Sequence, residues 1–522
     1  MSINIEQWDI FEQTFAYSVA GNPFQDVQLE ATFTHQDRSV RVDGFYDGDE
    51  NFKVRCMPDQ PGEWQYVTRS NVPALDGQQG LFNCTPAGAN NHGPVRVVEA
   101  VHFAYEDGAP YYPVGTTCYV WNLQGDELEQ RTLKTLESAP FNKMRMCLFP
   151  KRYRFNHNEP PSYPFPGEVT IPWNPENLDN LHALPPEPFW DFERFNPAYF
   201  RHLETRIRDL RERGIEADLI LFHPYDFGAW GFDRIPADVR ARLLKYLVAR
   251  LAAYRNLWWS FANEYDLMFG RTLEDWDHDM QLVQSLDPYN HLRGIHNCGG
   301  KFYDHSKPWV THCSIQTHNL NTVPVWLHKY AKPVVIDECG YEGDVFMMWG
   351  DLSPEEMVLR FWLGFAFGGY VGHGETYLNE QDQLWWSKGG ALYGQSPARI
   401  AFLRQILSEI PGYGLLPLKL MQYTELGYAN ELFPLPEAAM KLLPEGMWNM
   451  EAGGFRGLDY FLFYYGMHQP RLKYFNLPEG QFKIDVIDTW NMTIETAHEC
   501  AQGNIRVELP ARKYMAIRIQ RV

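Results

Sequence analysis

Two glutamates each end a short apolar segment of this chain. Glu264 closes the run Trp258-Trp-Ser-Phe-Ala-Asn-Glu, and Glu338 closes the run Val334-Val-Ile-Asp-Glu. Cleavage of a glycosidic bond needs one carboxylic acid to protonate the leaving oxygen and one carboxylate to attack or to activate water. We therefore predict that Glu264 acts as general acid and base and that Glu338 acts as nucleophile.

The elements around these glutamates must bring them to one rim. From about residue 109 onward, apolar runs alternate with amphipathic segments that have helical spacing. Strands are expected over 111–121, 143–149, 217–223, 257–262, 292–296, 312–317, 333–337 and 370–374. Eight such units in about 300 residues are typical of a (β/α)8 barrel, whose active sites lie at the C-terminal ends of the strands. The fourth and seventh strands would then present Glu264 and Glu338 at the same rim.

Both ends of the chain show a different pattern. Residues from Val27 to Phe33 and from Phe482 to Val486 alternate between apolar and polar, as half-buried strands do. We therefore predict the α/β fold class, with a (β/α)8 TIM barrel over residues 101–411. An N-terminal β-sandwich over 1–100 and a C-terminal β-sandwich-like domain over 412–522 would flank it.

The order of these motifs resembles that of the clan A glycoside hydrolases. In that clan the acid/base follows an Asn at strand four, as in Asn263-Glu264, and the nucleophile ends strand seven. The segment Phe141-Asn-Lys-Met-Arg145 is similar to the clan's second strand. The resemblance implies that Arg145 supports the nucleophile electrostatically.

Three histidines also match places in the clan. His223 occupies the place of the histidine at strand three, and the resemblance implies that His296 and His318, after strands five and six, line the sugar site. Strand six carries Gln316 and His318 where many members of the clan carry a Tyr. The group that hydrogen-bonds the nucleophile is therefore left open.

Across its full length the chain is similar to bacterial proteins with three parts. These proteins combine an N-terminal domain of unknown function (DUF5060), a barrel like that of clan A and a C-terminal domain of unknown function (DUF5605). The segments Gly115-Thr-Thr-Cys-Tyr and Arg145-Met-Cys-Leu-Phe-Pro-Lys carry this similarity. It implies a glycosidase and gives no substrate.

Residues after the eighth strand offer alternatives. Glu375, in Gly372-His-Gly-Glu-Thr-Tyr, is the rival of Glu338 as nucleophile, and we interpret it as substrate-binding. Trp385 could stack on a sugar face, although core packing is nearly as good an interpretation. Histidines at strand ends could also bind a metal. No His-x-His follows the first strand, so we predict neither metal nor cofactor.

A long loop rich in proline and aromatic residues follows the second strand. It covers residues 150–190 and would lie on the C-terminal face of the barrel. Structureless loops of this length are uncommon and are often functional. We expect it to border the active site.

Charge and composition limit the classes of partner. The net charge of −20 argues against nucleic acid and anionic membranes. No apolar run of about 18 residues could span a membrane, and the N-terminus has no segment typical of an export signal. We expect a cytoplasmic protein whose eight cysteines are reduced thiols. Its partner would be an oligosaccharide or small glycoside, and a homo-oligomer is compatible with these features.

Together these features predict a retaining glycoside hydrolase. It would cleave short plant-type or other oligosaccharides or glycosides by double displacement with two glutamates. Two alternatives stay open: a non-catalytic carbohydrate-binding barrel protein and a metal-dependent barrel hydrolase. The presence of both carboxylates argues against the first alternative.

Overall fold

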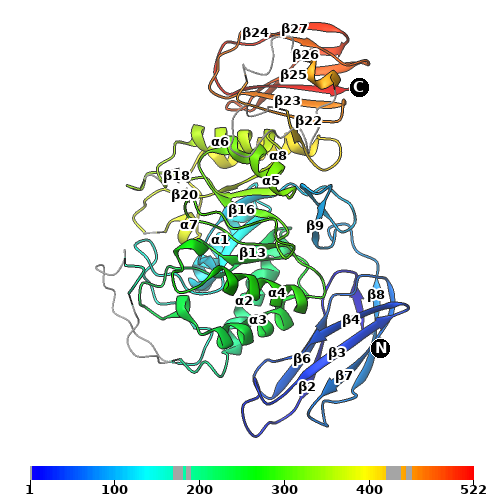
Figure 1. The fold of residues 1–522 in the computed structure, drawn as a ribbon, viewed down its shortest axis with the longest axis vertical. Helices are drawn as coiled ribbons and strands as arrows, with labels where there is room; N and C mark the ends of the chain where they lie inside the picture. The colour runs from blue at the N-terminus through cyan, green and yellow to red at the C-terminus, as the bar shows by residue number, and fades with distance from the viewer. Residues whose placement is uncertain are drawn as a thin grey trace.

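The computed structural model describes residues 3–167, 180–183, 190–347, 349–381, 383–418, 437–442 and 450–522. A barrel lies at the centre of the molecule, and a β-domain lies at each end of the long axis (Figure 1). The N-terminal domain contacts one side of the barrel, and the C-terminal domain lies over the helices α6 and α8. The fold predicted from the sequence is confirmed. The predicted domain boundaries stay predictions.

Eight parallel strands form the barrel in the order β15-β14-β13-β12-β11-β19-β17-β16. An isolated bridge between His296 and Ser314 joins the two ends of this order, so the sheet closes on itself. The strands are β11 (Val114–Thr117), β12 (Lys143–Cys147), β13 (Glu216–Phe222), β14 (Leu257–Ala262), β15 (Arg293–Gly294), β16 (Cys313–Gln316), β17 (Val334–Glu338) and β19 (Tyr370–His373).

Helices surround the barrel, and side chains cap the starts of α2, α4 and α6. The Asn196 side chain accepts a hydrogen bond from the N–H of Ala198 at the start of α2, and Thr272 and Asp275 form a capping box at α4. The α-helices of this part are α1 (Asp126–Leu136), α2 (Pro197–Glu212), α3 (Ala237–Leu251), α4 (Leu273–Leu286), α5 (Val323–Tyr330), α6 (Pro354–Ala366), α7 (Trp385–Lys388) and α8 (Ser396–Ser408). Short 3-10 turns are η1 (Trp121–Leu123), η3 (Phe232–Arg234), η4 (Tyr265–Leu267) and η5 (Leu320–Thr322).

Charged side chains fill the barrel beneath its C-terminal rim. Lys143 is fully buried and forms ion pairs with Asp218 at 2.5 Å and with Asp337 at 2.7 Å. Buried charges of this kind persist only when they are paired. This network therefore fixes β12, β13 and β17 relative to one another directly below the predicted site.

The N-terminal domain consists of two packed sheets. Its core contains stacked Phe11 and Phe82, whose ring centroids lie 4.0 Å apart. One sheet has the order β1-β8-β7-β3-β4 and the other β2-β6-β5. The strands are β1 (Asn4–Glu6), β2 (Phe11–Ala16), β3 (Leu29–His35), β4 (Arg38–Asp43), β5 (Phe45–Tyr46), β6 (Asn51–Cys56), β7 (Gly62–Ser70) and β8 (Gln79–Thr85). The hairpin β9 (Val95–Val98) and β10 (His102–Tyr105) leads into the barrel.

The C-terminal domain is also a β-structure. A six-stranded sheet has the order β21-β22-β23-β28-β25-β26, and β24 pairs with β27. The elements are β21 (Leu416–Pro417), α9 (Glu437–Met440), β22 (Ala452–Arg456), β23 (Tyr460–Tyr465), β24 (Leu472–Asn476), β25 (Phe482–Asp488), β26 (Thr493–Ala501), β27 (Asn504–Glu508) and β28 (Met515–Arg521). Two further short strands, β18 (Glu342–Gly343) and β20 (Glu375–Thr376), pair above the barrel.

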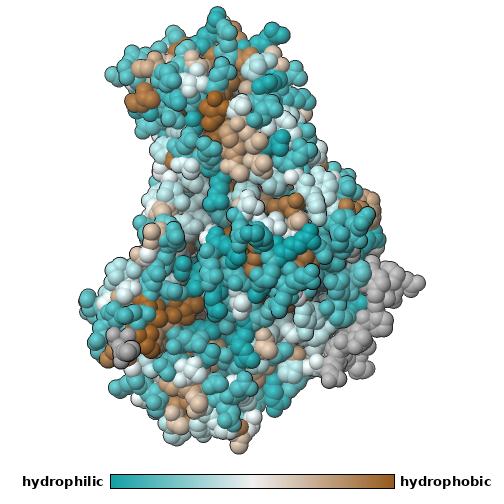
Figure 2. All heavy atoms as spheres, turned by 180° about the vertical axis from the view of Figure 1, so that it is seen from behind, coloured by the Kyte–Doolittle hydropathy of each residue, from teal (hydrophilic) through white to brown (hydrophobic). Residues whose placement is uncertain are grey.

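The surface is mostly hydrophilic on the face opposite to that of Figure 1 (Figure 2). An apolar area is visible on the N-terminal domain, whose exposed large apolar side chains include Ile3, Val67 and Leu81. Among the described residues, no helix has the length and hydropathy needed to cross a bilayer. All eight cysteines are unpaired.

Candidate active site

Glu338 is the last residue of β17, and an irregularity in the strand directs its side chain. The register between β16 and β17 shifts so that Gln316 lies opposite Glu338. Neighbouring residues of a regular strand point to opposite faces. Here both Asp337 and Glu338 face the barrel interior, because Asp337 pairs with Lys143 and Glu338 pairs with Arg145. Strand irregularities near active sites often re-aim a side chain in this way.

Two groups bind the same carboxylate oxygen of Glu338. Arg145, from β12, donates from Nη1 to Oε1 over 2.8 Å, and the Tyr119 hydroxyl donates to the same oxygen. The Tyr341 hydroxyl lies beside this carboxylate. Tyr119 follows β11, so the hydrogen-bonding neighbour that the sequence left open comes from strand one and not from strand six.

These neighbours favour the ionised form of Glu338. Burial alone would raise the pKa of Glu338, but the charge of Arg145 and the hydroxyls of Tyr119 and Tyr341 lower it below its ordinary value. Burial lowers the pKa of nearby His296 to about 3, so this imidazole is neutral near pH 7. We therefore assign the electrostatic part of the effect on Glu338 to Arg145.

Glu264 follows β14 and precedes η4, and it has an unusual backbone conformation. Its φ and ψ are both 55°, in the left-handed region that residues other than glycine seldom adopt. Such strain persists where the surrounding structure enforces it, and it is concentrated at functional sites. The side chain is only 5% exposed, and Cys298 and Gln316 lie beside it.

Glu264 differs from Glu338 in its ionisation. Burial raises the pKa of Glu264 to about 7, and the negative charge of Glu338 acts in the same direction, whereas Lys151 opposes it. One carboxyl group is thus held protonated up to near-neutral pH while the other is held ionised. This division matches the acid and nucleophile roles of a glycosidase pair.

Asn263 connects the two halves of the site. Its Oδ1 accepts hydrogen bonds from Arg145 over 2.9 Å and from Tyr119 over 3.3 Å, the same two residues that hold Glu338. Its Nδ2 is buried and has no partner within the described part of the chain. This nitrogen is therefore available to donate to a bound ligand.

Other buried polar atoms nearby also lack hydrogen-bond partners. Most buried polar atoms in proteins are paired, so a cluster of unpaired ones needs an explanation. A ligand rich in hydroxyl groups, or water molecules, would provide hydrogen-bond partners for these atoms. Within the described residues, the unpaired atoms near the two glutamates are Asn263 Nδ2, Glu264 Oε2, Arg145 Nε, both ring nitrogens of His296, Gln316 Oε1, the Tyr341 hydroxyl and Trp386 Nε1.

The catalytic segment matches a known family. A model described as "Apiosidase-like, catalytic domain" matches residues 99–391, which is more than half of the 522 residues. The chain belongs to the apiosidase-like family. Models of two domains of unknown function match the ends, DUF5060 over residues 4–71 and DUF5605 over residues 448–520, as the sequence predicts.

Solved structures support the same assignment. A candidate glycoside hydrolase from Bacteroides vulgatus ATCC 8482 is 38% identical, covers 100% of both chains and has a TM-score of 0.88. A glycoside hydrolase family 5 protein from the same organism is 16% identical, covers 82% of this chain and 94% of its own, and shares the fold with a TM-score of 0.59. The comparison with curated proteins gave no match. The apiosidase-like chain is a glycoside hydrolase.

The structure brings together only some of the side chains expected to bind substrate. Arg145, Asn263 and His296 lie around the two glutamates. His223 lies nearby, but its Nε2 contacts the Phe149 carbonyl at 3.3 Å and its Nδ1 accepts from a backbone N–H. Both ring nitrogens of His223 are thus used within the protein, where they hold the loop after β12. A role of His223 in substrate binding stays a prediction.

His318 and Trp385 also differ from expectation. His318 is exposed and lies edge-on to Trp349, with ring centroids 6.3 Å apart. Trp385 is 1% exposed and donates to Thr116 over 2.8 Å, so it packs in the core. Its neighbour Trp386 instead contacts Tyr119, with ring centroids 5.7 Å apart.

Glu375 is held by backbone donors. Its two carboxylate oxygens accept hydrogen bonds from the N–H groups of Tyr393 over 2.6 Å and of Gly394 over 2.8 Å. Burial raises its pKa to about 7. Glu342 packs beside it and accepts from the first residues of α8. Within the described residues no contact links Glu375 to Glu264 or Glu338, and its hydrogen bonds fix the loop before α8. Its role in substrate binding stays a prediction.

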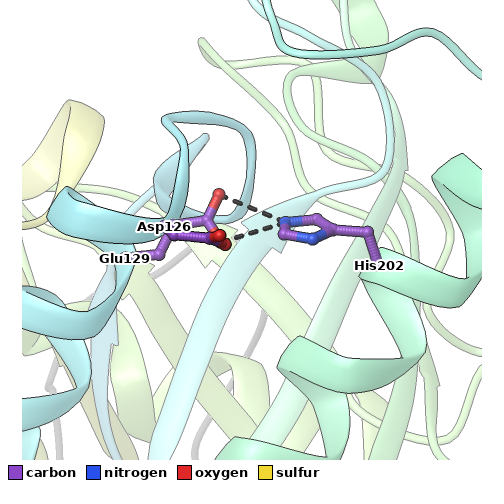
Figure 3. Close-up of side chains that lie close together, drawn as sticks. All are labelled: Asp126, Glu129 and His202. Atoms are coloured by element: carbon purple, nitrogen blue, oxygen red, sulfur yellow. Dashed lines mark hydrogen bonds and ion pairs between the residues drawn. The ribbon is translucent and has the colours of Figure 1, made fainter.

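Among the described residues of the apiosidase-like chain, two groups of side chains have the spacing of metal ligands, with ligand atoms within 4.8 Å of one another. In the first, Asp126, Glu129 and His202 converge, and the dashed contacts of Figure 3 join His202 to Glu129. Arg206 also pairs with Glu129 at 3.2 Å, so protein cations already neutralise this carboxylate.

The second group combines Glu342, His373 and Glu375. Backbone N–H groups already bind both carboxylates. Both carboxylates of the second group are therefore bound within the protein, whereas Nε2 of His373 has no hydrogen-bond partner among the described residues.

Sequence reasoning missed several neighbours of the glutamates. Tyr119, Tyr341 and Lys151 follow strands one, seven and two respectively, each within a few residues of the strand's end. Their position directly after barrel strands, at the C-terminal rim, is the sequence feature that could have identified them. Of the long loop, Tyr153 and Phe155 contact Trp386, while residues such as Trp173 and Phe189 lie outside the described residues.

Proposed function

We propose that this glycoside hydrolase is a retaining enzyme in which Glu264 is the acid/base and Glu338 is the nucleophile. The observation that carries the proposal is the opposite ionisation of the two carboxyl groups. The pKa of Glu264 is raised to about 7 and that of Glu338 is lowered. Their position at the ends of β14 and β17 also supports it.

In the first step, Glu264 gives its proton to the glycosidic oxygen as the bond from that oxygen to the anomeric carbon breaks. Glu338 forms a bond to the anomeric carbon. Arg145 and Tyr119 both hold Oε1 of Glu338, so we assign the attack to Oε2. The free Nδ2 of Asn263 would donate to a sugar hydroxyl and orient the ring.

In the second step, Glu264 acts as base. Once Glu338 is esterified it no longer carries a negative charge, so one cause of the raised pKa of Glu264 disappears. The pKa of Glu264 then falls, and its carboxylate can take a proton from water while the water oxygen attacks the anomeric carbon. The ester bond breaks and Glu338 is released as a carboxylate.

The substrate remains a short plant-type or other oligosaccharide or a small glycoside. The name of the family adds apiosides to the sugars that should be screened. Predicted cytoplasmic location would fit small, imported saccharides.

Proton NMR of the first product tests the mechanism. An aryl glycoside found active in such a screen is hydrolysed in the spectrometer, in buffer with EDTA. We expect the anomer first released to have the configuration of the substrate. Release of the opposite anomer would indicate inversion and contradict the assignment of Glu338 as nucleophile. Loss of turnover in EDTA that zinc or manganese restores would favour a metal-dependent hydrolase.

A further inference from the structure

Lys151 is a buried cation beside the two catalytic glutamates. It lies four residues after β12 and is only 2% exposed. Its ammonium nitrogen lies 3.4 Å from the ring centroid of Tyr119, 4.0 Å from that of Tyr225 and 4.6 Å from that of Tyr153. We call these three rings, with Trp386 at 5.6 Å, the aromatic cage.

No acceptor binds this ammonium group within the described residues. The other two cations of the barrel mouth are paired: Lys143 contacts two aspartates, and Arg145 contacts Glu338 and Asn263. For Lys151, neither a hydrogen bond from Nζ nor an ion pair is found in the part of the chain that the structure describes. An ammonium group has three N–H donors and no acceptor, so all three are available.

The aromatic cage offsets only part of the cost of burying this charge. Ring faces attract a cation but do not accept its three hydrogen bonds as carboxylates do. Burial lowers the pKa of Lys151 to about 8, and Cys147, Glu264 and Glu338 act against this shift. Lys151 is therefore still mostly protonated at pH 7, which leaves a poorly solvated positive charge near the reacting groups.

We propose that Lys151 binds a carboxylate on the sugar that is cleaved, so that the preferred substrate is a glycoside of a sugar acid such as a uronic acid. This inference rests on the proposed function, because it places the sugar between Lys151 and the pair Glu264 and Glu338.

Two properties of the surroundings favour a carboxylate over a neutral hydroxyl. A hydrogen bond between two charged groups is about twice as strong as one between neutral groups. The aromatic cage keeps the local dielectric low, which strengthens an ion pair formed there. The tyrosine and tryptophan rings also offer apolar surface to the C–H face of a sugar ring. A neutral sugar would leave the charge of Lys151 uncompensated.

Matched substrate pairs test the proposal. Aryl uronides are compared with the corresponding neutral glycosides, which differ only in a carboxylate or CH2OH at C6, for the gluco and galacto series in both anomers. For the wild type we expect kcat/KM for the preferred uronide to exceed that of its neutral partner by at least about tenfold. Lys151→Met keeps the length and apolar stem of the side chain, and it should lower this ratio by at least about tenfold, mainly through KM.

Arg154→Met is the matched control. Arg154 belongs to the same loop and is exposed, with its guanidinium 4.8 Å from the ring centroid of Phe346. Removing its charge should change the ratio by less than about twofold, and added salt should abolish even that change. A Lys151→Met variant that lowers both rates equally, or a wild type with no preference for uronides, would overturn the proposal.

Calorimetry on the wild-type protein tests the proposal without relying on the correct folding of Lys151→Met. Free glucuronate and galacturonate are titrated into the wild-type enzyme, and their affinities are compared with those of glucose and galactose. We expect the acid to bind more tightly, and to lose this advantage as the pH rises above about 8 and Lys151 loses its proton. Equal binding at all pH values would contradict the role of Lys151. Hydrolysis of neutral glycosides alone would contradict this inference but leave the proposed function intact, whereas hydrolysis of neither class would contradict both.

Discussion

At the scale of single residues, one oxygen of Glu338 receives hydrogen bonds from both Arg145 and Tyr119, while Oε2 of Glu264 receives none from the described residues. This difference in hydrogen bonding contributes to the difference in ionisation between the two carboxyl groups. A carboxylate that accepts charged and hydroxyl donors stays ionised, and a buried carboxyl without them keeps its proton.

The pH dependence of catalysis follows from these shifts. We expect kcat/KM to fall as the pH rises through about 7, where Glu264 loses its proton. At the acid end it should fall only below the ordinary range of a glutamate, because the pKa of Glu338 is lowered. In Glu338→Gln the negative charge is absent, so the pKa of Glu264 should decrease, as carbon NMR of labelled glutamate can measure. An unchanged pKa of Glu264 in this variant would contradict the electrostatic coupling of the pair.

The sequence predicted the pair and Arg145 because those residues lie in or directly after strands. It did not predict Lys151, whose approach to the pair and to the ring of Trp386 depends on how two separate loops fold back over the rim. The hydrogen bonds of Glu375 could not be predicted either. Its spacing after β19 suggested a place in the site, but the backbone donors of residues 393–394 that bind it leave no pattern in the sequence.

At the scale of elements, the barrel strands were predictable because each is an apolar run followed by a helix. The fourth strand was predicted over 257–262 and is Leu257–Ala262. The fifth was predicted over 292–296 but is only Arg293–Gly294, because the chain beyond it makes a single bridge to β16. Helix α5 begins at Val323 and includes Pro324, since proline is tolerated in a first turn. The irregularity at Glu338 depends on pairing and could not be predicted.

The ion pairs below the rim should contribute strongly to the stability of the barrel. Lys143→Met would leave Asp218 and Asp337 buried without their cation, which should cost about 3–5 kcal/mol in the free energy of unfolding. The exposed pair between Lys134 and Glu137 is the control, and Lys134→Met should cost less than about 1 kcal/mol. Urea unfolding followed by near-ultraviolet circular dichroism measures both. Equal, small effects would show that the buried network is not required for the barrel.

At the scale of the whole molecule, the N-terminal domain is joined to the barrel by a buried charge network. Glu204 of α2 pairs with Arg55 of the sandwich at 2.8 Å and with Arg250 of α3 at 2.7 Å, and Arg250 also pairs with Asp47 of the sandwich at 2.8 Å. The three-part organisation was predictable from the change in sequence periodicity. This interface was not, because Arg55 and Glu204 are 149 residues apart in sequence. The predicted homo-oligomer stays a prediction.

Glu204 should therefore couple the stability of the two domains. Burial alone would raise the pKa of Glu204, but Arg55 and Arg250 lower it below its ordinary value. Its contribution to stability should be present above the ordinary pKa of a glutamate and be lost as the pH falls through the lowered value. Glu204→Ala removes one of the two carboxylate partners of each buried arginine, because Arg55 keeps Glu12 and Arg250 keeps Asp47, and it should cost about 3 kcal/mol. Calorimetric unfolding at pH 7 measures this.

Asp238→Ala provides the comparison for Glu204→Ala. It breaks the exposed pair with Arg242, at 2.8 Å on the surface of α3, and should cost less than about 1 kcal/mol. If the two variants unfold alike, the charge network does not hold the domains together.

The assignment of the nucleophile is tested most directly by chemical rescue with azide. Glu338→Gly should lower kcat for an aryl glycoside by roughly 10⁴-fold, about 5.5 kcal/mol of transition-state stabilisation. Added azide should restore turnover by attacking the anomeric carbon in place of the missing carboxylate, and the glycosyl azide should have the inverted configuration. Glu375→Gly, the matched variant at the rival glutamate, should show no rescue because its carboxylate binds the backbone N–H groups of Tyr393 and Gly394. An inverted glycosyl azide from Glu375→Gly, with none from Glu338→Gly, would contradict the account.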